Sequence, residues 1–326
     1  MPHAYRFCLR RNGGPEVLEA EPIDPPAPGS GEVLVRHQAV GLNFIDTYHR
    51  SGLYPVTLPS GLGLEAAGVV EEVGEGVTEL RPGNRVGYFS GPLGAYSSHR
   101  AIAAARLVAI PDAITADKAA ALLLKGCTAE MLIERCAEVR PSDTVLVHSA
   151  AGGVGSILVP WLKHIGARVI AHAGSAAKAA QASELGADEA LSCSYDVLAA
   201  EVRRLTGGKG VEVVLDGVGA ASWAASLGAV ARRGTIVTYG NASGPGPAFS
   251  PLELARAGSV FVTRPTLFDY VVTPEELARS AARLFELIAA GVIQARIGQS
   301  FPLLEAAEAH RALEARRTTG STILIP

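Results

Sequence analysis

The pattern of apolar and polar positions changes twice along the chain. In the first third, short Val-rich runs such as 32–36 and 68–73 alternate with turn signals such as Pro25-Pro26 and the segment 81–84. Short apolar runs bounded by Gly and Pro are typical of short strands. The N-terminal part is therefore predicted to be an irregular β domain with small barrels.

From about Ile114 onward, the pattern becomes a regular alternation of helices and strands. Two helices are predicted first, at 116–124 and 128–137. Strands are then predicted at 143–149, 167–173, 189–191, 211–215 and 235–239, with helices at 153–165, at 178–185 and before residue 211. Strand–helix alternation predicts crossover connections and a doubly wound, parallel sheet, hence an α/β fold.

The C-terminal part returns to a different pattern. Thr273, Pro274 and Glu276 stand where a capping residue, a first-turn proline and a third-position glutamate begin a helix, and Gly291 is placed to end it. A second helix is predicted at 304–315 and a final strand at 322–325.

Composition and charge exclude several classes of protein. With 326 residues, 48% of them hydrophobic and 19% charged, the chain is long enough for about two globular domains. Its net charge of −3 gives no reason to expect nucleic acid or an anionic membrane as a partner. No stretch approaches the ~20 apolar residues of a membrane span, and the N-terminus lacks the apolar run of a signal peptide. We therefore expect a cytoplasmic protein.

The cysteines do not form a recognisable metal or disulfide pattern. The four of them are scattered, without a Cys-x-x-Cys pair: Cys8, Cys127, Cys136 and Cys193. This distribution favours reduced packing residues over a four-cysteine zinc site.

A glycine-rich turn follows the first predicted strand of the parallel sheet, in the segment 145–155 (VLVHSAAGGVG). Gly152 lets the backbone approach a pyrophosphate, Gly155 lets the helix pack close to the strand, and the helix N-terminus offers N–H groups to phosphate. Ala150 takes the first glycine position of the usual fingerprint, so the strand–turn–helix–strand setting strengthens an otherwise weak motif. A dinucleotide site is predicted; the alternative is a tight turn without a ligand.

The end of the second strand distinguishes NADPH from NADH. An NAD site carries Asp or Glu there, whereas no acidic residue occurs between Gly155 and Glu184. Ser175 and Lys178 follow the strand and are suited to bind a 2′-phosphate. Lys178 alone is better interpreted as a solvated helix residue, but together with the missing acid it favours NADPH.

Seven segments spread over the chain carry a resemblance to a known family. They are 13–18, 41–48 (GLNFIDTY), 50–55, 94–98, 150–155, 262–265 and 320–321. In these segments the chain resembles the medium-chain dehydrogenase/reductase superfamily, and within it the zinc-free bacterial quinone oxidoreductases related to ζ-crystallin. The resemblance implies a Rossmann NADPH-binding domain at 124–266, inserted into a GroES-like catalytic domain made of 1–123 and 267–326.

The resemblance also implies which residues contact the cofactor, from the nicotinamide and the pyrophosphate to the 2′-phosphate and the covering loops. They are Asn43, Phe44, Asp46, Tyr48, Met131, Gly152, Gly153, Val154, Gly174, Ser175, Lys178, Cys193, Val218, Asn241, Ser243, Gly244, Thr266, Leu267, Phe268 and Arg316. At Cys193 these reductases tend to carry a tyrosine against the adenine, and Tyr195 is a candidate to replace it.

Zinc alcohol dehydrogenases are also similar to this chain, but their metal ligands are missing. Their first cysteine corresponds to a position near Asn43, and their Gly-His-Glu motif reads Gly63-Leu64-Glu65 here. A catalytic zinc needs about three protein ligands, which Glu65 cannot supply alone. We therefore expect no metal.

Metal independence bears on the reaction. Alcohol oxidation is disfavoured without a Lewis acid, whereas a quinone accepts a hydride, or single electrons, because its product is aromatic. The resemblance implies an NADPH:quinone oxidoreductase that aligns the nicotinamide against a flat substrate. The catalytic candidates are Asn43, Asp46, Tyr48 and Tyr54. Asp46 is interpreted equally well as a structural hydrogen-bond acceptor, and the two tyrosines as walls of the site.

Two other functions remain open at this point. One is an NADPH-dependent reductase of activated C=C bonds, such as an enone or enoyl thioester, because one fold hosts several chemistries. The other is a low-turnover NADPH-binding structural or RNA-associated protein, against which the net charge of −3 weighs.

A short apolar strand at 258–263 is expected at the edge of the parallel sheet. Bare apolar edges favour pairing with another chain, and a two-fold axis brings the same patch together from both subunits. We expect a homodimer through residues 260–263, with Val260 and Val262 in the interface. The alternative is that the segment after Pro265 covers this edge within one chain.

Overall fold

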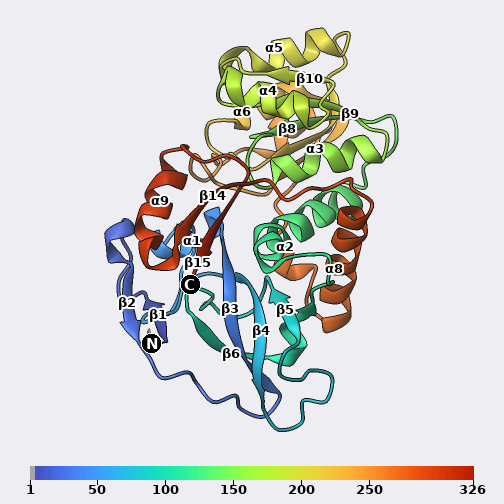
Figure 1. Cartoon of the computed structure of the whole chain (residues 1–326). Helices are drawn as coiled ribbons and strands as arrows, with labels where there is room; N and C mark the ends of the chain where they lie inside the picture. The colour runs from blue at the N-terminus through green and yellow to red at the C-terminus, as the bar shows by residue number, and fades with distance from the viewer. Residues whose placement is uncertain (1–3) are drawn as a thin grey trace. The chain divides into compact units, whose positions relative to one another are not determined.

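The computed structural model describes residues 4–326 and divides into two compact units (Figure 1). Unit 1 takes in the chain up to Cys127, with Val271–Phe285 and Ala295–Pro326. Unit 2 comprises Thr128–Tyr270 and Glu286–Gln294.

Unit 1 is built on strands, as the Gly- and Pro-bounded apolar runs predicted. Its seven-stranded sheet has the order β14-β15-β3-β4-β5-β7, with β6 also paired to β3, and a separate β1-β2 pair lies beside it. The strands are β1 Tyr5–Cys8, β2 Glu19–Pro22, β3 Glu32–Leu42, β4 Glu65–Val73, β5 Arg85–Tyr88, β6 His99–Ala103, β7 Val108–Ala109, β14 Ile297–Pro302 and β15 Ser321–Ile325. All pairs are antiparallel except β14 with β15.

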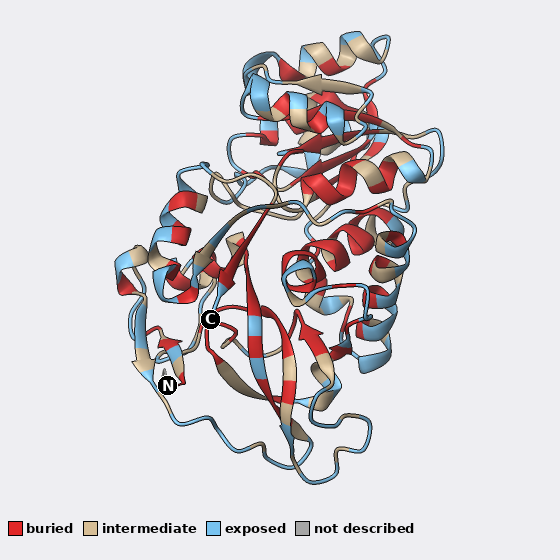
Figure 2. Cartoon of the chain, in the orientation of Figure 1, coloured by how far each residue is buried: buried red, intermediate tan, exposed pale blue. Residues whose placement is uncertain are grey.

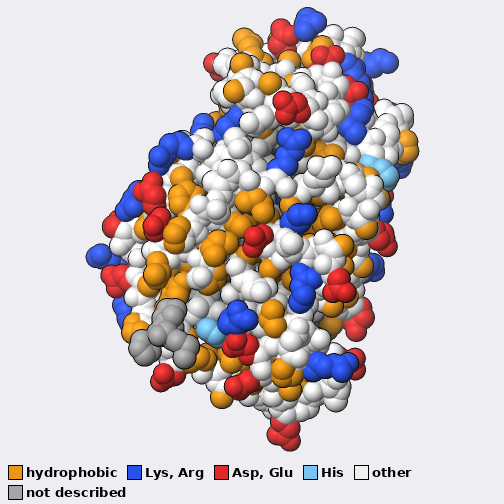
Figure 3. Space-filling view, viewed as in Figure 1, with side chains coloured by type: hydrophobic (Ala, Val, Ile, Leu, Met, Phe, Trp, Pro, Cys, Tyr) orange, Lys and Arg blue, Asp and Glu red, His pale blue; other side chains and the backbone are white. Residues whose placement is uncertain are grey.

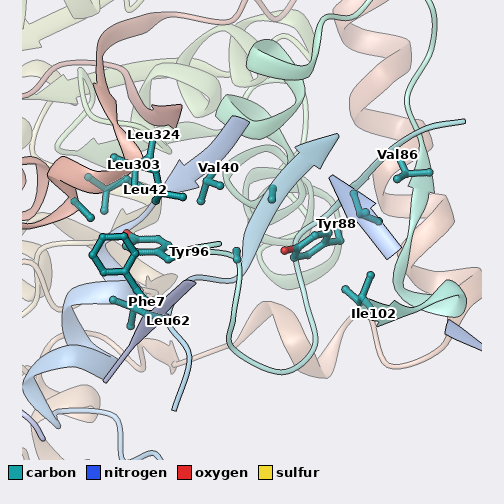
Figure 4. Close-up of a cluster of buried hydrophobic side chains, with 14 of the residues drawn as sticks. Phe7, Val40, Leu42, Leu62, Val86, Tyr88, Tyr96, Ile102, Leu303 and Leu324 are labelled. Atoms are coloured by element: carbon teal, nitrogen blue, oxygen red, sulfur yellow. The ribbon is translucent and has the colours of Figure 1, made fainter. Parts of the chain in front are cut away.

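The core of unit 1 is one cluster of buried side chains that includes residues of β3, β4, β5 and β15 and of the helix α9, Ala306–Glu314. Figure 4 shows Tyr96 and Phe7 together with Leu303 and Leu324, and Tyr88 further along the same cluster. The rings of Phe7 and Tyr96 meet edge to face at a centroid distance of 6.1 Å. Both tyrosines are fully buried, so their hydroxyl groups need partners inside the unit.

Unit 2 contains the predicted parallel sheet. Its six strands have the order β10-β9-β8-β11-β12-β13, and every neighbouring pair is parallel. The strands are β8 Thr144–His148, β9 Arg168–His172, β10 Glu189–Leu191, β11 Val211–Asp216, β12 Val230–Thr238 and β13 Phe261–Thr263. Numbered along the chain, this is the doubly wound order 3-2-1-4-5-6, whose direction reverses between β8 and β11.

The central strands of unit 2 are buried on both faces, as Figure 2 shows. This burial explains why 145–147 reads as a continuous apolar run rather than as an alternation. The helices of this unit are α3 Gly155–His164, α4 Ala176–Glu184, α5 Tyr195–Leu205, α6 Trp223–Ala229 and α7 Pro251–Arg256. The α/β fold class with a Rossmann-type sheet is thereby confirmed.

The helices before the parallel sheet differ from the prediction. The sequence predicted two helices, at 116–124 and 128–137, but α2 runs unbroken from Ala116 to Glu130 and continues as a π-helix over Met131–Cys136. Gly126 lies within this continuous helix, and a Cβ at this position would lie 2.5 Å from the Leu284 side chain. This glycine provides room for the helix α8, Pro274–Ala289, and does not end α2.

The remaining helix predictions are confirmed. Thr273 and Glu276 cap the start of α8 reciprocally, with hydrogen bonds of 3.3 Å and 3.2 Å, and Gly291 after its end has a φ of 73°. The helix α1, Phe44–Ser51, follows β3. None of the helices in residues 4–326 is long and apolar enough to cross a membrane.

Candidate functional site

The turn after β8 needs glycine at one position above all. A Cβ on Gly155 would lie 2.4 Å from the Ser149 carbonyl oxygen and 2.7 Å from Ala150 Cα. The contact is with backbone, so it cannot be relieved by moving a side chain. At Gly152 a Cβ would lie 3.0 Å from Ser149 Oγ and 3.1 Å from the Ser149 carbonyl oxygen, which is tight but less severe than at Gly155. The close approach of strand and helix that the sequence predicted at Gly155 is therefore present.

The segment after β9 is open and carries polar groups. Gly174 and Ser175 are exposed, and a Cβ on Gly174 would meet nothing within 4 Å. Ser175 caps α4: its Oγ accepts a hydrogen bond from the Lys178 N–H at 3.3 Å, which leaves the Ser175 hydroxyl proton available to a ligand. The N-terminus of α4, Ser175 and the half-buried Lys178 together suit a phosphate group.

The loops after the other strands hold one another in place. Ser243 Oγ donates to the Val218 carbonyl at 2.9 Å, and the Ala220 N–H donates to the Gly244 carbonyl at 3.0 Å. A Cβ on Gly219 would lie 2.3 Å from that same Gly244 oxygen. Because all six strands are parallel, these loops and the turns after β8 and β9 emerge at the same edge of the sheet.

The predicted cofactor contacts of unit 2 therefore gather at the carboxyl edge of its sheet, with one exception. Met131 precedes β8 and is buried in the π-helix. Cys193 follows β10, and its carbonyl accepts a hydrogen bond from His172 Nε2 at 2.9 Å. Thr266 follows β13 and is exposed, with Leu267 buried and Phe268 half-buried beyond it.

Tyr195, the candidate substitute for an adenine-side tyrosine, begins α5. Its ring centroid lies 4.9 Å from that of His172 and 5.8 Å from that of His148. The ring is thus packed against two imidazoles at the ends of β9 and β8. Its replacement of the adenine contact stays a prediction.

A buried polar network behind these loops was missed by sequence reasoning. Asp216, at the end of β11, accepts hydrogen bonds from the Val218 N–H at 2.8 Å and from Ser222 and Ser226 hydroxyls at 2.7 Å. Ser226 Oγ also lies 3.0 Å from His148 Nε2, and burial lowers the pKa of His148 to about 4. The network ties the loop that carries Val218 to the strand that precedes the glycine turn. A buried aspartate at a strand end was the available signal.

In unit 1, Asn43 begins α1 and belongs to a buried polar cluster. Asn43 Nδ2 donates to Glu65 Oε2 at 2.8 Å, and the Leu124 N–H donates to Glu65 Oε1 at 2.7 Å. Lys125 Nζ lies 3.4 Å from Glu65 Oε2, and both side chains are buried. Glu65, which the sequence offered only as an insufficient zinc ligand, is thus the anchor that orients Asn43.

Asp46 lies one helical turn beyond Asn43 and is fully buried. Its Oδ2 accepts hydrogen bonds from the Asn43 N–H at 2.9 Å and from the Tyr96 hydroxyl at 3.1 Å. Burial raises the pKa of the Asp46 carboxyl to about 7, although these hydrogen bonds and the charge of Lys125 lower it. Near neutral pH, both protonation states of a carboxyl group with such a pKa are populated, as general acid or base catalysis requires.

The aromatic candidates form a row on α1 and the loop after it. The rings of Tyr48 and Tyr54 meet edge to face at 5.2 Å, and Phe44 lies 6.4 Å from Tyr48. Such a row offers flat, largely apolar contact area with phenolic hydroxyl groups. Arg316, the last predicted contact, is exposed just after α9.

The expected absence of a metal site concerns the same region. Leu64, in the place of the histidine ligand of zinc dehydrogenases, is buried. Among residues 4–326, no group of three or more His, Cys, Asp or Glu side chains is arranged to hold a metal ion. This finding describes the side chains and leaves metal independence as an expectation.

Comparisons with known proteins agree with this arrangement. Residues 29–112 match the model of the alcohol dehydrogenase GroES-like domain, and residues 153–286 match that of the zinc-binding dehydrogenase family. The chain is 50% identical to a quinone oxidoreductase of Pseudomonas aeruginosa over 324 residues, which are 99% of this chain and 100% of the relative. It is 41% identical to a 2-haloacrylate reductase of a Burkholderia species, over 98% of both chains.

A solved structure is similar over the same length. The crystal structure of Escherichia coli quinone oxidoreductase complexed with NADPH has a TM-score of 0.96 and 45% identity, covering 99% of this chain and 100% of that one. Full-length identity at this level establishes common ancestry as well as a common fold. The chain belongs to the quinone oxidoreductase family, in the ζ-crystallin-like branch of the medium-chain dehydrogenase/reductase superfamily.

Proposed function

We propose that this protein is an NADPH-dependent quinone oxidoreductase that works without a metal. The observation that carries the proposal is the carboxyl edge of the parallel sheet, where a backbone-constrained Gly155 adjoins an open, acid-free segment with Ser175 and Lys178. The relatives named quinone oxidoreductase, and the one complexed with NADPH, support it. The domain boundaries expected from the sequence, 124–266 for the nucleotide domain, and a cytoplasmic location are part of the same proposal.

In unit 2, the cofactor would be held by the loops at the sheet edge. Gly152, Gly153 and Val154 would bind the pyrophosphate through backbone N–H groups, as helix N-termini do. The 2′-phosphate would bind Gly174, Ser175 and Lys178, and the loops that carry Val218, Asn241, Ser243 and Gly244 would cover the dinucleotide. NADPH, when bound, supplies the hydride.

In unit 1, the residues on and after α1 would receive the substrate. The rings of Tyr48 and Tyr54 would contact a flat quinone. Asn43, oriented by Glu65, would donate to a quinone oxygen the N–H that lies at 3.4 Å from the Gly41 carbonyl. Reduction of a quinone to a hydroquinone by a hydride takes up one further proton. Asp46 is the candidate to hold that proton, because its pKa of about 7 leaves it partly protonated at neutral pH.

The test is an assay of NADPH oxidation with a panel of quinones and of activated alkenes. We expect efficient turnover with quinones, and the same activity in the presence of a strong chelator. The similarity to a 2-haloacrylate reductase favours the alkene reductase as the second candidate function. A higher kcat/KM for a haloacrylate or an enone than for every quinone tested would make the alkene reductase the better supported function.

The RNA-associated alternative receives no support from the net charge of −3 or from the face of the molecule drawn in Figure 3. On the face seen in Figure 3, Lys and Arg side chains are interspersed with Asp and Glu rather than gathered into a stripe. Nucleic-acid binding requires a concentrated basic surface. We therefore propose a small molecule, and no nucleic acid, as the partner of the site.

We also propose a homodimer that forms through the outer edge of β13. This strand is the last in the sheet order, and Phe261 on it is 64% exposed. The sequence predicted Val260 and Val262 in the interface, whereas we now propose Phe261 at its centre because of how these residues are buried. Val260 is only 6% exposed and belongs to the core of unit 2, and Val262 packs against that core. Side chains alternate between the two faces of a strand, so Phe261 lies on the opposite face from Val260 and Val262 and is the exposed apolar residue of this edge strand.

Light scattering tests the dimer. The wild-type protein should have twice the chain mass of 33.7 kDa at micromolar concentration. Phe261→Glu should shift it towards the monomer, whereas Val197→Glu, at another exposed apolar position in unit 2, should not. A monomeric wild-type protein would contradict the proposal.

A further inference from the structure

A row of buried polar side chains runs through unit 1 and ends at Asp46. Arg50 Nη1 lies 2.9 Å from His310 Nδ1, His310 Nε2 lies 2.9 Å from Tyr96 Oη, and Tyr96 Oη lies 3.1 Å from Asp46 Oδ2. All four side chains are buried. Arg50 is held at the outer end by Glu314, whose Oε2 lies 3.1 Å from Nη1.

The chemistry of the first member fixes the direction of every bond in this row. A guanidinium group only donates, so His310 Nδ1 accepts and carries no proton. Burial and the charge of Arg50 lower the pKa of His310 to about 3, so the ring is neutral and its single proton lies on Nε2. His310 Nε2 therefore donates to Tyr96 Oη, and Tyr96 donates its only proton to Asp46.

This direction determines what the row can do for Asp46. Oδ2 already accepts two hydrogen bonds, from the Asn43 N–H and from Tyr96, which favour the carboxylate form. Oδ1 is buried and has no hydrogen-bond partner within residues 4–326, so a proton is added at Oδ1. The row cannot itself deliver that proton, because arginine stays protonated and His310 would become an anion.

The other charged groups that act on Asp46 are Lys125 and Glu65, which have opposite effects on it. Lys125 lowers the pKa of Asp46 and Glu65 raises it, so their contributions oppose one another. The hydrogen bonds to Oδ2 are thus the main interactions that counteract burial. Of the two donors, the Asn43 N–H is part of the helix start, and Tyr96 is the one that a side-chain substitution can remove.

We propose that Arg50, His310 and Tyr96 form a one-directional hydrogen-bond chain that holds Asp46 Oδ2 as an acceptor and leaves Oδ1 as the atom that carries the proton. Tyr96 and His310 are then positioning residues, which set the pH at which Asp46 exchanges its proton. Their effect on the reaction rests on the role given to Asp46 in the proposed function. Their effect on the titration of Asp46 itself is independent of the proposed function.

The experiment follows the Asp46 carboxyl directly, by ¹³C NMR in the protein without cofactor. In Tyr96→Phe the midpoint of the Asp46 titration should rise by about one pH unit, the equivalent of one lost hydrogen bond to a charged group. Tyr88→Phe is the matched control: Tyr88 is equally buried in the same core, but its hydroxyl bonds His37 at 3.0 Å. This variant should leave the Asp46 midpoint unchanged.

A second pair of variants tests the middle of the chain. Gln at position 310 offers one amide oxygen to Arg50 and one amide N–H to Tyr96, so His310→Gln should stay close to the wild type. His310→Leu offers neither and should raise the Asp46 midpoint. In the wild-type protein, ¹⁵N shifts should show His310 as the neutral Nε2–H form from about pH 5 to pH 9.

An unchanged Asp46 midpoint in Tyr96→Phe, or a His310 proton on Nδ1, would overturn the chain. The pH dependence of quinone reduction is measured in the same variants. If the Asp46 midpoint moves in Tyr96→Phe and the rate profile moves with it, both the chain and the role of Asp46 are supported. If the midpoint moves and the rate profile does not, the chain stands and the proposed role of Asp46 is contradicted.

Discussion

The buried ion pair between Glu65 and Lys125 gives the sharpest stability prediction. Lys125→Met removes the ammonium group but keeps a stem of similar length in the core. Glu65 is fully buried, and its Oε2 lies 3.4 Å from Lys125 Nζ, so the substitution leaves a buried carboxylate without this counter-charge. Breaking a buried pair by removing one partner costs about 3–5 kcal/mol.

The lower end of that range applies here. Glu65 retains the hydrogen bonds from Asn43 Nδ2 and the Leu124 N–H, which continue to stabilise its charge. We therefore expect a loss of about 3 kcal/mol, a large part of the roughly 5–15 kcal/mol that a domain has in total. The double variant Glu65→Gln/Lys125→Met removes both charges. The side-chain amide of Asn43 can flip by 180°, so that its oxygen accepts a hydrogen bond from the amide N–H of the new glutamine. This variant should lose only about 1 kcal/mol.

The assay is urea unfolding, followed by a signal from unit 1. Both tryptophans, Trp161 and Trp223, belong to unit 2, whereas five of the eight tyrosines, among them the buried Tyr88 and Tyr96, belong to unit 1. The tyrosine region of near-ultraviolet circular dichroism is therefore the probe that reports mainly on unit 1. Lys118→Met, at an exposed position on the same helix, is the control and should change stability by less than about 0.5 kcal/mol. A Lys125→Met variant as stable as the double variant would refute the reasoning, because it would show that Glu65 needs no counter-charge.

Three further predictions concern the cofactor and pH. Lys178→Ala should weaken NADPH binding at least about tenfold, the loss of one charge-assisted phosphate contact, and leave NADH binding nearly unchanged by calorimetry; equal losses would remove Lys178 from the 2′-phosphate site. Gly155→Ala should weaken both nucleotides, because its Cβ would lie 2.4 Å from the Ser149 carbonyl oxygen, and retained affinity would show that the turn adapts. Burial lowers the pKa of three histidines, to about 3, about 4 and about 3 for His37, His148 and His310. Below about pH 6.5 the unfolded chain therefore binds more protons than the folded one. The midpoint temperature of thermal unfolding should decrease as the pH is lowered from about 6.5 to about 4. The raised pKa of Asp46 acts in the opposite direction between about pH 4 and pH 7, and a flat profile would contradict the neutral state of the histidines.

Much of the fold was accessible from the sequence because local patterns determine it. Strands buried on both faces leave continuous apolar runs, and the turn signals between them placed the strands of unit 2 within a few residues. The single α2 helix was not accessible in this way. The sequence predicted two helices separated by residues 125–127, and only the approach of Leu284, far away in the chain, shows that Gly126 makes room for a second helix.

The candidate site was predicted unevenly for the same physical reason. Its glycine turn is a local motif and could be read directly. Three residues of the site act through partners that are distant in the sequence, so no short sequence pattern predicts them: Tyr96, His310 and Glu65. A weaker signal did exist in α9, where Ala306, Ala309 and His310 are spaced for one helix face and all are buried. A histidine on such a face needs a polar partner inside the protein.

Helix α1 carries the most informative pattern of this kind. Asp46 and Arg50 are four residues apart, a spacing that favours a direct ion pair on the helix surface. In the structure, Arg50 instead forms hydrogen bonds with His310 and Glu314, and Asp46 accepts one from Tyr96. A direct contact with arginine would favour the ionised form of Asp46 strongly. Two neutral groups stand between them, so Asp46 has no direct contact with the arginine. Burial then raises the pKa of Asp46 to about 7, and the carboxyl remains able to hold a proton at neutral pH.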